Sequence, residues 1–293
     1  MAIATRIADI PAVKRSVALR SFILAAWLGW QIESNWASPF LFAIYSIARP
    51  VASVLILVVM YSVITDGATK EPIFAYIYMG NALYILVSNI LTGISWAVID
   101  DREHYRTAKQ IHTAPISGYA YLLGRGVARL FIGSISVLIT TVFGVIAFSI
   151  PLSIDLPLLI ASTIVGVASL AAFGVILGAL TLQLGRSAWT VGEAVGGGLY
   201  LFTGAIFPLD VLPAWLQPIG YLLPATYWLE VTRRALLGAN VPRFPTFAGF
   251  SDWGLIGILV IFSALLWAFS LFFYNVSLRR AKNLGLLDME TNY

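Results

Sequence analysis

The segment from Asp100 to Pro115, DDREHYRTAKQIHTAP, contains the densest group of residues in this chain that could perform acid–base or metal chemistry. Six of its first ten residues are charged, and both histidines of the chain, His104 and His112, lie within it. Zinc sites use histidine and carboxylate ligands, but two histidines eight residues apart match no compact ligand pattern, and arginines crowd the segment. We therefore expect no metal site and no catalytic residues here.

Other sequence motifs of enzymes and of ATP-binding proteins are missing. A phosphate-binding loop needs a glycine directly before its lysine, whereas the lysines at positions 14, 70, 109 and 282 follow valine, threonine or alanine. Neither a G-x-S-x-G nor an H-E-x-x-H motif is present. Without cysteine the chain has no disulfide, thiol nucleophile or thiolate metal ligand. We expect a protein that is not an enzyme and that binds no cofactor itself.

The composition is that of a membrane protein. Hydrophobic residues make up 59% of the chain and charged residues only 11%, whereas about a quarter of the residues in a soluble domain are charged. Four uncharged runs exceed the roughly 20 residues that cross a bilayer as a helix. Two further runs each contain one charge, Arg49 or Glu193. We therefore predict a single all-α membrane domain with six spans, at residues 41–64, 73–99, 130–150, 157–182, 188–207 and 254–277.

The distribution of basic residues predicts the orientation of these spans. With six spans, 14 of the 18 lysines and arginines fall on the side that carries both termini. Because basic residues concentrate in cytoplasmic loops, we expect a multi-pass protein of the inner (plasma) membrane with both termini in the cytoplasm. The basic residues form no single soluble patch, so we expect no nucleic-acid partner. The N-terminal residues lack a continuous apolar stretch, and we expect no removable signal peptide.

Residues 13–33 begin basic and become apolar and rich in tryptophan. Their uncharged core is too short to span a membrane, which favours a helix lying in the membrane interface. An oblique extension of the first span is the alternative. Glycines four residues apart, at 174 and 178 and again at 192 and 196, favour close helix packing, within the chain or between subunits.

Residues 208–238 are interrupted by proline every five or six residues, so the apolar pieces are too short to cross a bilayer. Lipid cannot satisfy the backbone groups of a broken helix. The segment is therefore expected to form a re-entrant, interfacial or protein-packed outer hairpin, with an aromatic belt that includes Trp215, Tyr227 and Trp228. Glu230 can pair with Arg233 and Arg234 on one helical face. That group is either surface charge or a structural lock.

Transport coupled to protons usually needs ionisable groups deep in the spans. Glu193 alone qualifies, and a glutamate near the interface is favoured over a proton relay. The energy source is therefore expected in another chain.

Two motifs resemble the permease subunit of type-2 ABC exporters. The first is the acidic-Arg-Glu loop Asp101-Arg102-Glu103 followed by Thr113-Ala114-Pro115. Where many members have x-Gly-Thr after Arg-Glu, this chain has His104, Tyr105 and Arg106 before Thr107. The second, more specific motif is a broken hairpin that contains Gly204-Ala205-Ile206-Phe207-Pro208, Leu212-Pro213-x-Trp215-Leu216, Leu223-Pro224-Ala225-Thr226-Tyr227, Arg233 and Leu237-Gly238.

The resemblance implies a dimer of permeases with two ATPase subunits, which bind the ATP and Mg²⁺. We expect a homodimer, and the sequence leaves a heterodimer of permeases open. It implies that residues 100–117 form a cytoplasmic coupling loop and that spans one, two and five line the substrate path, with Arg49 and Glu193 in it. The expected substrate is an amphipathic or hydrophobic, drug-like or lipid-like molecule. The coupling residues implied are Asp101, Arg102, Glu103, Arg106 and Lys109, and the outer-hairpin residues implied are Pro208, Pro213, Trp215, Pro224, Tyr227, Glu230 and Arg233.

Three other functions remain open from the sequence. The chain could be the permease of a polysaccharide or glycolipid ABC exporter, an ATP-independent secondary transporter, or a membrane enzyme that acts on lipid.

Overall fold

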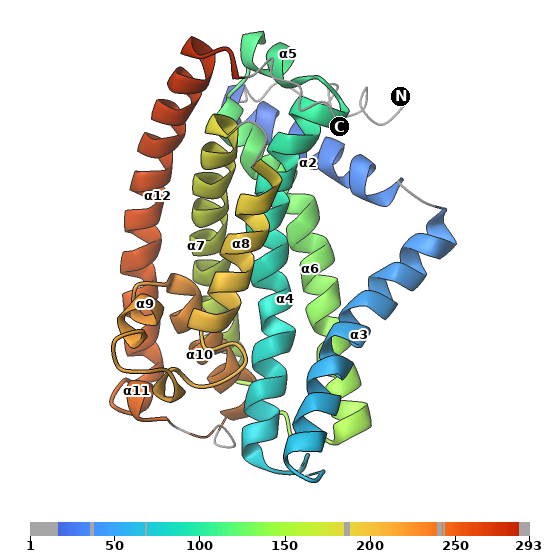
Figure 1. Cartoon of the computed structure of the whole chain (residues 1–293), viewed down its shortest axis with the longest axis vertical. Coiled ribbons are helices and arrows are strands. Elements are labelled where there is room, and N and C mark those ends of the chain that lie inside the picture. Colours follow the sequence, from blue (N-terminus) through green and yellow to red (C-terminus); the bar gives the residue numbers. More distant parts are fainter. Residues whose placement is uncertain are drawn as a thin grey trace.

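The computed structural model of this chain describes residues 17–35, 38–67, 69–184, 188–238, 242 and 244–286, without the side chains of residues 109, 112, 188 and 189. All regular secondary structure in these ranges is helical (Figure 1). Five helices are long and apolar enough to cross a membrane. They are α3 (Pro39–Ile64), α4 (Pro72–Ile99) with its π-helical extension η1 (Asp100–His104), α6 (Gly118–Phe148), α7 (Leu156–Gln183) and α12 (Asp252–Asn283). The chain is therefore an all-helical integral membrane protein.

Helix α8 (Ala188–Phe202) is shorter than the span expected at residues 188–207. Its 15 residues measure about 22 Å along the helix axis, less than the roughly 30 Å of a bilayer core. The backbone turns after Phe202, and Gly204 has a φ of +72°. A glycine in this left-handed region commonly follows the last turn of a helix.

Helix α6 begins at Gly118, well before the span predicted to start at residue 130. The predicted span was based on an uncharged run, and residues 118–129 were left out because they contain Arg125 and Arg129. Both side chains form ion pairs, Arg125 with Asp101 and Arg129 with Glu33. A paired arginine costs far less to bury than an isolated one, so the helix continues through both positions.

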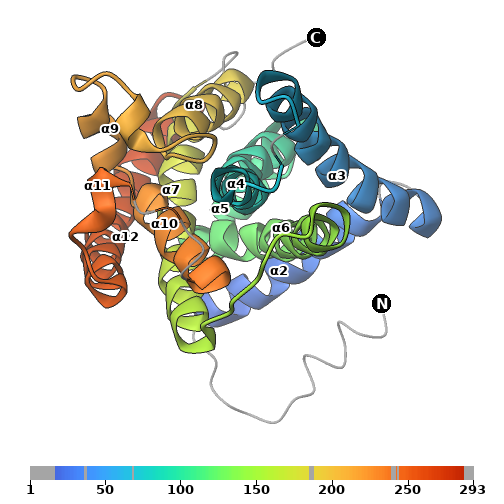
Figure 2. The same cartoon turned by 90° about the horizontal axis from the view of Figure 1, so that it is seen from below.

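Helix α4 lies at the centre of the bundle, in contact with α3, α6, α7 and α8 (Figure 2). Glycines on its neighbours allow this close approach. A Cβ on Gly174 of α7 would lie 2.7 Å from the Cδ1 atom of Ile94, and a Cβ on Gly133 of α6 would lie 2.9 Å from Leu86. The Gly174–Gly178 pair therefore packs within the chain. A Cβ on Gly197 or Gly198 of α8 would have no other atom within 4 Å.

Helix α2 (Val17–Ser34) packs along the first half of α6. Its buried face consists of Ser21, Ala25 and Gly29, and it exposes apolar side chains such as Trp27 on another face. Because Ser38 caps α3 through the amide of Leu41, α2 and α3 are separate helices. An oblique extension of the first span is therefore wrong, and the interfacial location of α2 stays a prediction.

The proline-rich segment folds into η2 (Leu209–Val211), α9 (Gln217–Tyr221) and α10 (Pro224–Leu237), followed by α11 (Pro245–Ala248). Prolines stand in the first turn of α9, α10 and α11, where a helix needs no backbone donor. These elements gather at the end of the bundle opposite α5 (Ala108–Thr113) (Figure 1).

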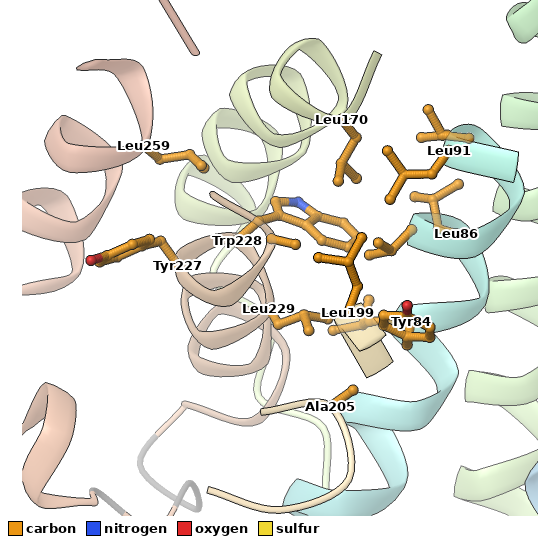
Figure 3. Packing of buried hydrophobic residues seen from close by; sticks show 14 of the residues in the cluster. Tyr84, Leu86, Leu91, Leu170, Leu199, Ala205, Tyr227, Trp228, Leu229 and Leu259 are labelled. Carbon is orange, nitrogen blue, oxygen red and sulfur yellow. The ribbon is translucent and has the colours of Figure 1, made fainter. Parts of the chain in front are cut away.

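Trp228 of α10 inserts into the core among leucines of α4, α7 and α8 (Figure 3). Gly166 of α7 makes the space, since a Cβ there would lie 1.9 Å from the Cδ1 atom of Trp228. The sequence placed Trp228 and Tyr227 in an aromatic belt, but both are buried. That prediction was wrong because every residue of α10 is buried, and both rings pack against neighbouring elements.

Candidate functional site

A cleft of about 690 Å³ lies between α3, α4, α6 and α8. Its volume falls within the range of pockets that bind small molecules, roughly 300–1,000 Å³. Arg49 of α3 and Glu193 of α8, the two charges expected in a substrate path, both line it. The structure thus brings together two residues that are far apart in the sequence.

The wall formed by α4 carries neutral polar side chains. Asn81, Ser88, Asn89 and Thr92 line the cleft at intervals of one, three or seven residues and so follow one side of the helix. A hydrogen-bonding wall with apolar neighbours such as Ile85 can contact both the polar and the apolar parts of a ligand.

Two tyrosines hold α8 against this wall. The Tyr200 hydroxyl donates to Oδ1 of Asn81 at 2.5 Å, and the Tyr84 hydroxyl donates to the carbonyl of Gly196. The two rings pack with their centroids 4.8 Å apart. These contacts fix the width of the cleft between α4 and α8.

Glu33 of α2 and Arg129 of α6 close one end of the cleft with an ion pair of 2.7 Å. Burial raises the pKa of the Glu33 carboxyl above its ordinary value, and the positive charge of Arg129 opposes the shift. Pro50, inside α3 and next to Arg49, removes one backbone hydrogen bond of that helix at the cleft.

The start of the predicted coupling loop is anchored to α6. The Asp101 carboxylate accepts from Nη1 of Arg125 at 2.8 Å and from the Tyr121 hydroxyl at 2.9 Å. The Asp100 carboxylate also lies 3.8 Å from Arg125, and it accepts from Nδ1 of His104 at 2.9 Å. The sequence did not identify Tyr121 or Arg125 as part of this site.

Arg102, one of the coupling residues that the resemblance implies, is only 4% exposed. Its Nη1 atom donates to the carbonyl of Leu184 at 2.7 Å, just beyond α7, and its Nη2 atom donates to Glu103 at 2.9 Å. Asp101 is buried as well, so neither side chain offers an outward contact surface, and the coupling role of both residues stays a prediction. Charged residues are rarely buried unless paired, and here pairing makes burial possible.

Residues 100–117 contain two short helices, not one. Arg102 and Glu103 belong to η1, whereas α5 begins only at Ala108. Between them Arg106 has a φ of +53°, a left-handed conformation that ends the first helix. Tyr105, Arg106 and Ile116 are exposed there, while the side chain of Lys109 lies outside the described residues.

At the opposite end, Glu230 and Arg234 of α10 form a buried ion pair of 2.9 Å. Glu230 is 3% exposed and accepts a hydrogen bond from Tyr76 of α4 at 3.2 Å. Arg234 also pairs with Asp252 of α12 at 2.9 Å and donates to the carbonyls of Phe247 and Phe250. The interpretation of Glu230 as surface charge was wrong, since this group joins α4, α10 and α12.

Arg233 completes the lock on the other side of α10. Its Nη2 atom donates to the carbonyls of Gly204 at 2.6 Å and Ala205 at 3.1 Å, directly after α8. Its guanidinium carbon lies 4.0 Å from the centre of the Tyr76 ring. Gly80 makes the space, because a Cβ there would lie 1.9 Å from the guanidinium.

The other predicted hairpin residues have local structural positions. Pro208 precedes η2, and Pro224 opens α10. Tyr227 donates its hydroxyl to the carbonyl of Tyr221 at 2.8 Å. Trp215 is 77% exposed, as expected for an aromatic residue at a membrane surface. Pro213 accepts through its carbonyl from the amide of Leu216 at 2.8 Å, which closes a turn.

Residues 32–272, most of the chain, match the family described as ABC-2 family transporter protein. The chain belongs to the ABC-2 transporter family. One curated relative is named "Probable multidrug ABC transporter permease YbhR" of Escherichia coli (strain K12), 22% identical over 153 residues, which are 52% of this chain and 41% of the relative. The corresponding YbhS of the same strain is 21% identical over 158 residues, 54% of this chain and 42% of the relative.

The match therefore covers about two fifths of the length of these curated relatives. Membership of the ABC-2 family confirms the resemblance to type-2 ABC permeases that the loop and hairpin motifs indicated. In this ABC-2 permease the loop and the hairpin lie at opposite ends of the bundle (Figure 1). The cleft is lined by residues of α3, α4, α6 and α8.

Sequence reasoning missed several residues of this ABC-2 permease's cleft, including Asn81, Tyr84 and Tyr200. Isolated neutral polar residues in an apolar run give no strong signal, because many of them bond to the preceding helical turn. The sequence did contain one signal, because Asn81, Ser88 and Thr92 stand at helical spacing on one face of residues 73–99.

Proposed function

We propose that this chain is the membrane-spanning subunit of an ATP-driven ABC exporter and that its cleft is part of the path of an amphipathic or hydrophobic, drug-like or lipid-like substrate. One observation carries the proposal. In an ABC-2 family chain whose sequence has no phosphate-binding loop, α3, α4 and α8 surround a polar-walled cleft of about 690 Å³. The names of YbhR and YbhS, as multidrug ABC transporter permeases, support the same function.

The proposed topology puts the α5 end in the cytoplasm, together with both termini, in the inner membrane. Helix α8 would be the fifth of six crossings. It begins shortly after Leu184, which binds Arg102 at the α5 end, and it stops before Gly204, which binds Arg233 at the other end. Residues 208–238 would then dip into the membrane from the outer side.

Coupling to an ATPase would pass through the α5 end. The proposed assembly is a homodimer of this permease with two ATPase subunits that bind ATP and Mg²⁺. Exposed residues of the loop, such as Tyr105, Arg106 and Ile116, would contact the ATPase. Asp101 and Arg102 would lie behind this contact surface and connect the loop to α6 and to the end of α7.

The test is co-purification of the cognate ATPase with variants of exposed loop residues. Tyr105→Asp and Ile116→Asp place a charge on the proposed contact surface without disturbing a buried side chain. We expect each to reduce ATPase recovery at least severalfold. Trp215→Asp, at an exposed position of the opposite end, is the matched control and should retain the ATPase. Full ATPase recovery with both loop variants would contradict the proposed coupling surface.

A further inference from the structure

Four charged side chains line the cleft, and two of them neutralise each other. Glu33 and Arg129 form the ion pair of 2.7 Å. The side chains of Arg49 and Glu193 form no ion pair and no hydrogen bond with any other residue among those described. A ligand in the cleft therefore meets one uncompensated positive charge and one uncompensated negative charge.

These two charges come from different walls of the cleft. Arg49 belongs to α3 and Glu193 to α8, and the two helices lie on different sides of α4 (Figure 2). A ligand between them can be contacted by both. A ligand with a single charge would be attracted to one of these two side chains and repelled by the other.

Asn81 supplies a third, neutral recognition element. Its Oδ1 atom accepts from Tyr200 at 2.5 Å, but its Nδ2 atom is buried and has no hydrogen-bond partner. The residue is 4% exposed and lines the cleft. A buried donor left without an acceptor is unfavourable, so a hydrogen bond from this nitrogen to an acceptor oxygen of a ligand would be favourable.

We propose that the cleft binds a zwitterionic amphiphile, with its anionic group at Arg49, its cationic group at Glu193 and an acceptor oxygen of its polar part at Asn81. This inference rests on the proposed function of the cleft as a substrate path, and it names the substrate class. Phe42, Ile85 and Ile132 line the same cleft and provide contacts for the apolar part of the molecule.

The test uses three amphiphiles with the same dodecyl chain. They are dodecylphosphocholine, which is zwitterionic, dodecyl sulfate, which is anionic, and dodecyltrimethylammonium, which is cationic and has no acceptor oxygen. Each is titrated by calorimetry, below its micelle concentration, into the full chain in phosphatidylglycerol nanodiscs. Empty nanodiscs provide the subtraction for partitioning into lipid.

Each charge variant should weaken only those probes that carry the charge opposite to the side chain that is lost. A hydrogen bond to a charged group is worth enough to change affinity roughly tenfold. Arg49→Gln should weaken dodecylphosphocholine and dodecyl sulfate by about that factor and spare dodecyltrimethylammonium. Glu193→Gln should weaken dodecylphosphocholine and dodecyltrimethylammonium and spare dodecyl sulfate. Glu71→Gln and Arg280→Gln, exposed charges outside the cleft, are the matched controls and should change nothing.

Asn81 variants test the donor separately. Asn81→Leu and Asn81→Asp both remove the Nδ2 donor, and the aspartate keeps an oxygen that can accept from Tyr200. Both should weaken dodecylphosphocholine several-fold, so a folding defect of the leucine variant alone cannot produce the result. Dodecyltrimethylammonium, which has no acceptor oxygen, should not lose affinity in either variant.

A final arm separates two sources of a zwitterion. If a membrane lipid is the ligand, nanodiscs with phosphatidylcholine should weaken dodecylphosphocholine binding by competition, whereas an exogenous ligand predicts equal affinity in both discs. Each of these two results keeps the recognition chemistry. Equal affinities of Arg49→Gln, Glu193→Gln and the unaltered chain for dodecylphosphocholine would overturn the inference. So would a uniform loss for all three probes.

The failure of this inference can be told from a failure of the proposed function. Loss of the charge pattern, together with ATP-driven export of another amphiphile by the chain and its ATPase, refutes only the zwitterion site. The full binding pattern, together with no ATP-driven export of any probe, refutes only the exporter function.

Discussion

At the residue scale, three glycines leave space for large side chains of a neighbouring helix. A Cβ on Gly80 would collide with Arg233, one on Gly144 would lie 2.4 Å from the Tyr78 ring, and one on Gly166 would lie 1.9 Å from Trp228. Trp228 is among the largest fully buried side chains of the described core. Space for these side chains, more than backbone conformation, explains why these positions are glycine.

Gly166→Ala should destabilise the protein because the added methyl group overlaps the Trp228 ring. Overpacking of this kind costs about 1–3 kcal/mol, and the apparent Tm in detergent should fall by several degrees. Gly257→Ala is the control, since a Cβ at that helical position has nothing within 4 Å. An unchanged Tm for Gly166→Ala would mean that the ring and α7 separate at little cost.

Glu230→Gln should be strongly destabilising. It removes the charge that two buried arginines share, at 2.9 Å from Arg234 and 4.0 Å from Arg233. Breaking a buried pair typically costs about 3 kcal/mol or more, so thermal unfolding should occur well below that of the unaltered chain. Glu71→Gln, an exposed glutamate beside α4, is the matched control and should be neutral. Equal stability of the two variants would contradict the assignment of Glu230 to a structural lock.

Residue identity predicted partners better than it predicted burial. Glu230 and its arginines stand at i+3 and i+4, so their pairing was visible in the sequence. Their burial was not, because it depends on Tyr76, Asp252 and two backbone carbonyls from distant segments. Arg102 was misjudged for the same reason, since its acceptor, the carbonyl of Leu184, is 82 residues away.

At the element scale, the π-helical turn η1 joins α4 to residues 105–117 and is held by α6. Asp101 is the central residue of this joint because it binds both Arg125 and Tyr121. The amide of Thr107 also donates to the carbonyl of Asp101 at 2.8 Å, which fixes the start of the loop. A displacement of α5 would therefore be transmitted to α4 and α6 together.

Asp101→Asn should loosen this joint without unfolding the bundle. It leaves Arg125 with only the more distant carboxylate of Asp100, at 3.8 Å. Hydrogen exchange of residues 105–116 should become faster by about tenfold or more, the effect of losing one charge-assisted hydrogen bond. His104→Ala, which changes an exposed side chain of the same turn, should leave the exchange rates nearly unchanged. Equal protection in both variants would contradict the anchoring role of Asp101.

Helix location was largely predictable, but helix ends were not. Four long uncharged runs, and a fifth run interrupted by Arg49, predicted the five helices that are apolar and long enough to cross a membrane. The run-based boundary failed in α6, where Arg125 and Arg129 are paired with residues of other helices. It failed in α8, where Phe207 and its neighbours are apolar but follow a left-handed glycine. Composition reports what can lie in lipid, whereas helix ends depend on pairing and backbone conformation.

At the scale of the whole molecule, the central helix α4 connects three regions. Its two ends contribute Tyr76 to the lock and Asp101, through η1, to the coupling joint, while Asn81 lies in the cleft. Helix α8 is held to α4 by two tyrosines and is followed by carbonyls that bind Arg233. In our account, movement imposed at α5 would change the width of the cleft through these connections.

The overall organisation was predictable because membrane helices are long and their polar exceptions few. The neutral polar lining of the cleft was not, since it consists of single polar residues that only the fold brings together. Arg49 and Glu193 were selected because charge is rare in a membrane span. Asn81, which is neutral, gave no comparable signal.

The central claim is that this chain moves its substrate only when an ATPase drives it, and one reconstitution tests that claim most directly. Proteoliposomes would contain the full chain with or without its cognate ATPase, and transport of a panel of drugs and amphiphilic lipids would be measured with and without ATP. We expect transport only when the chain, the ATPase and ATP are all present. Transport by the chain alone, unaffected by ATP, would contradict the account.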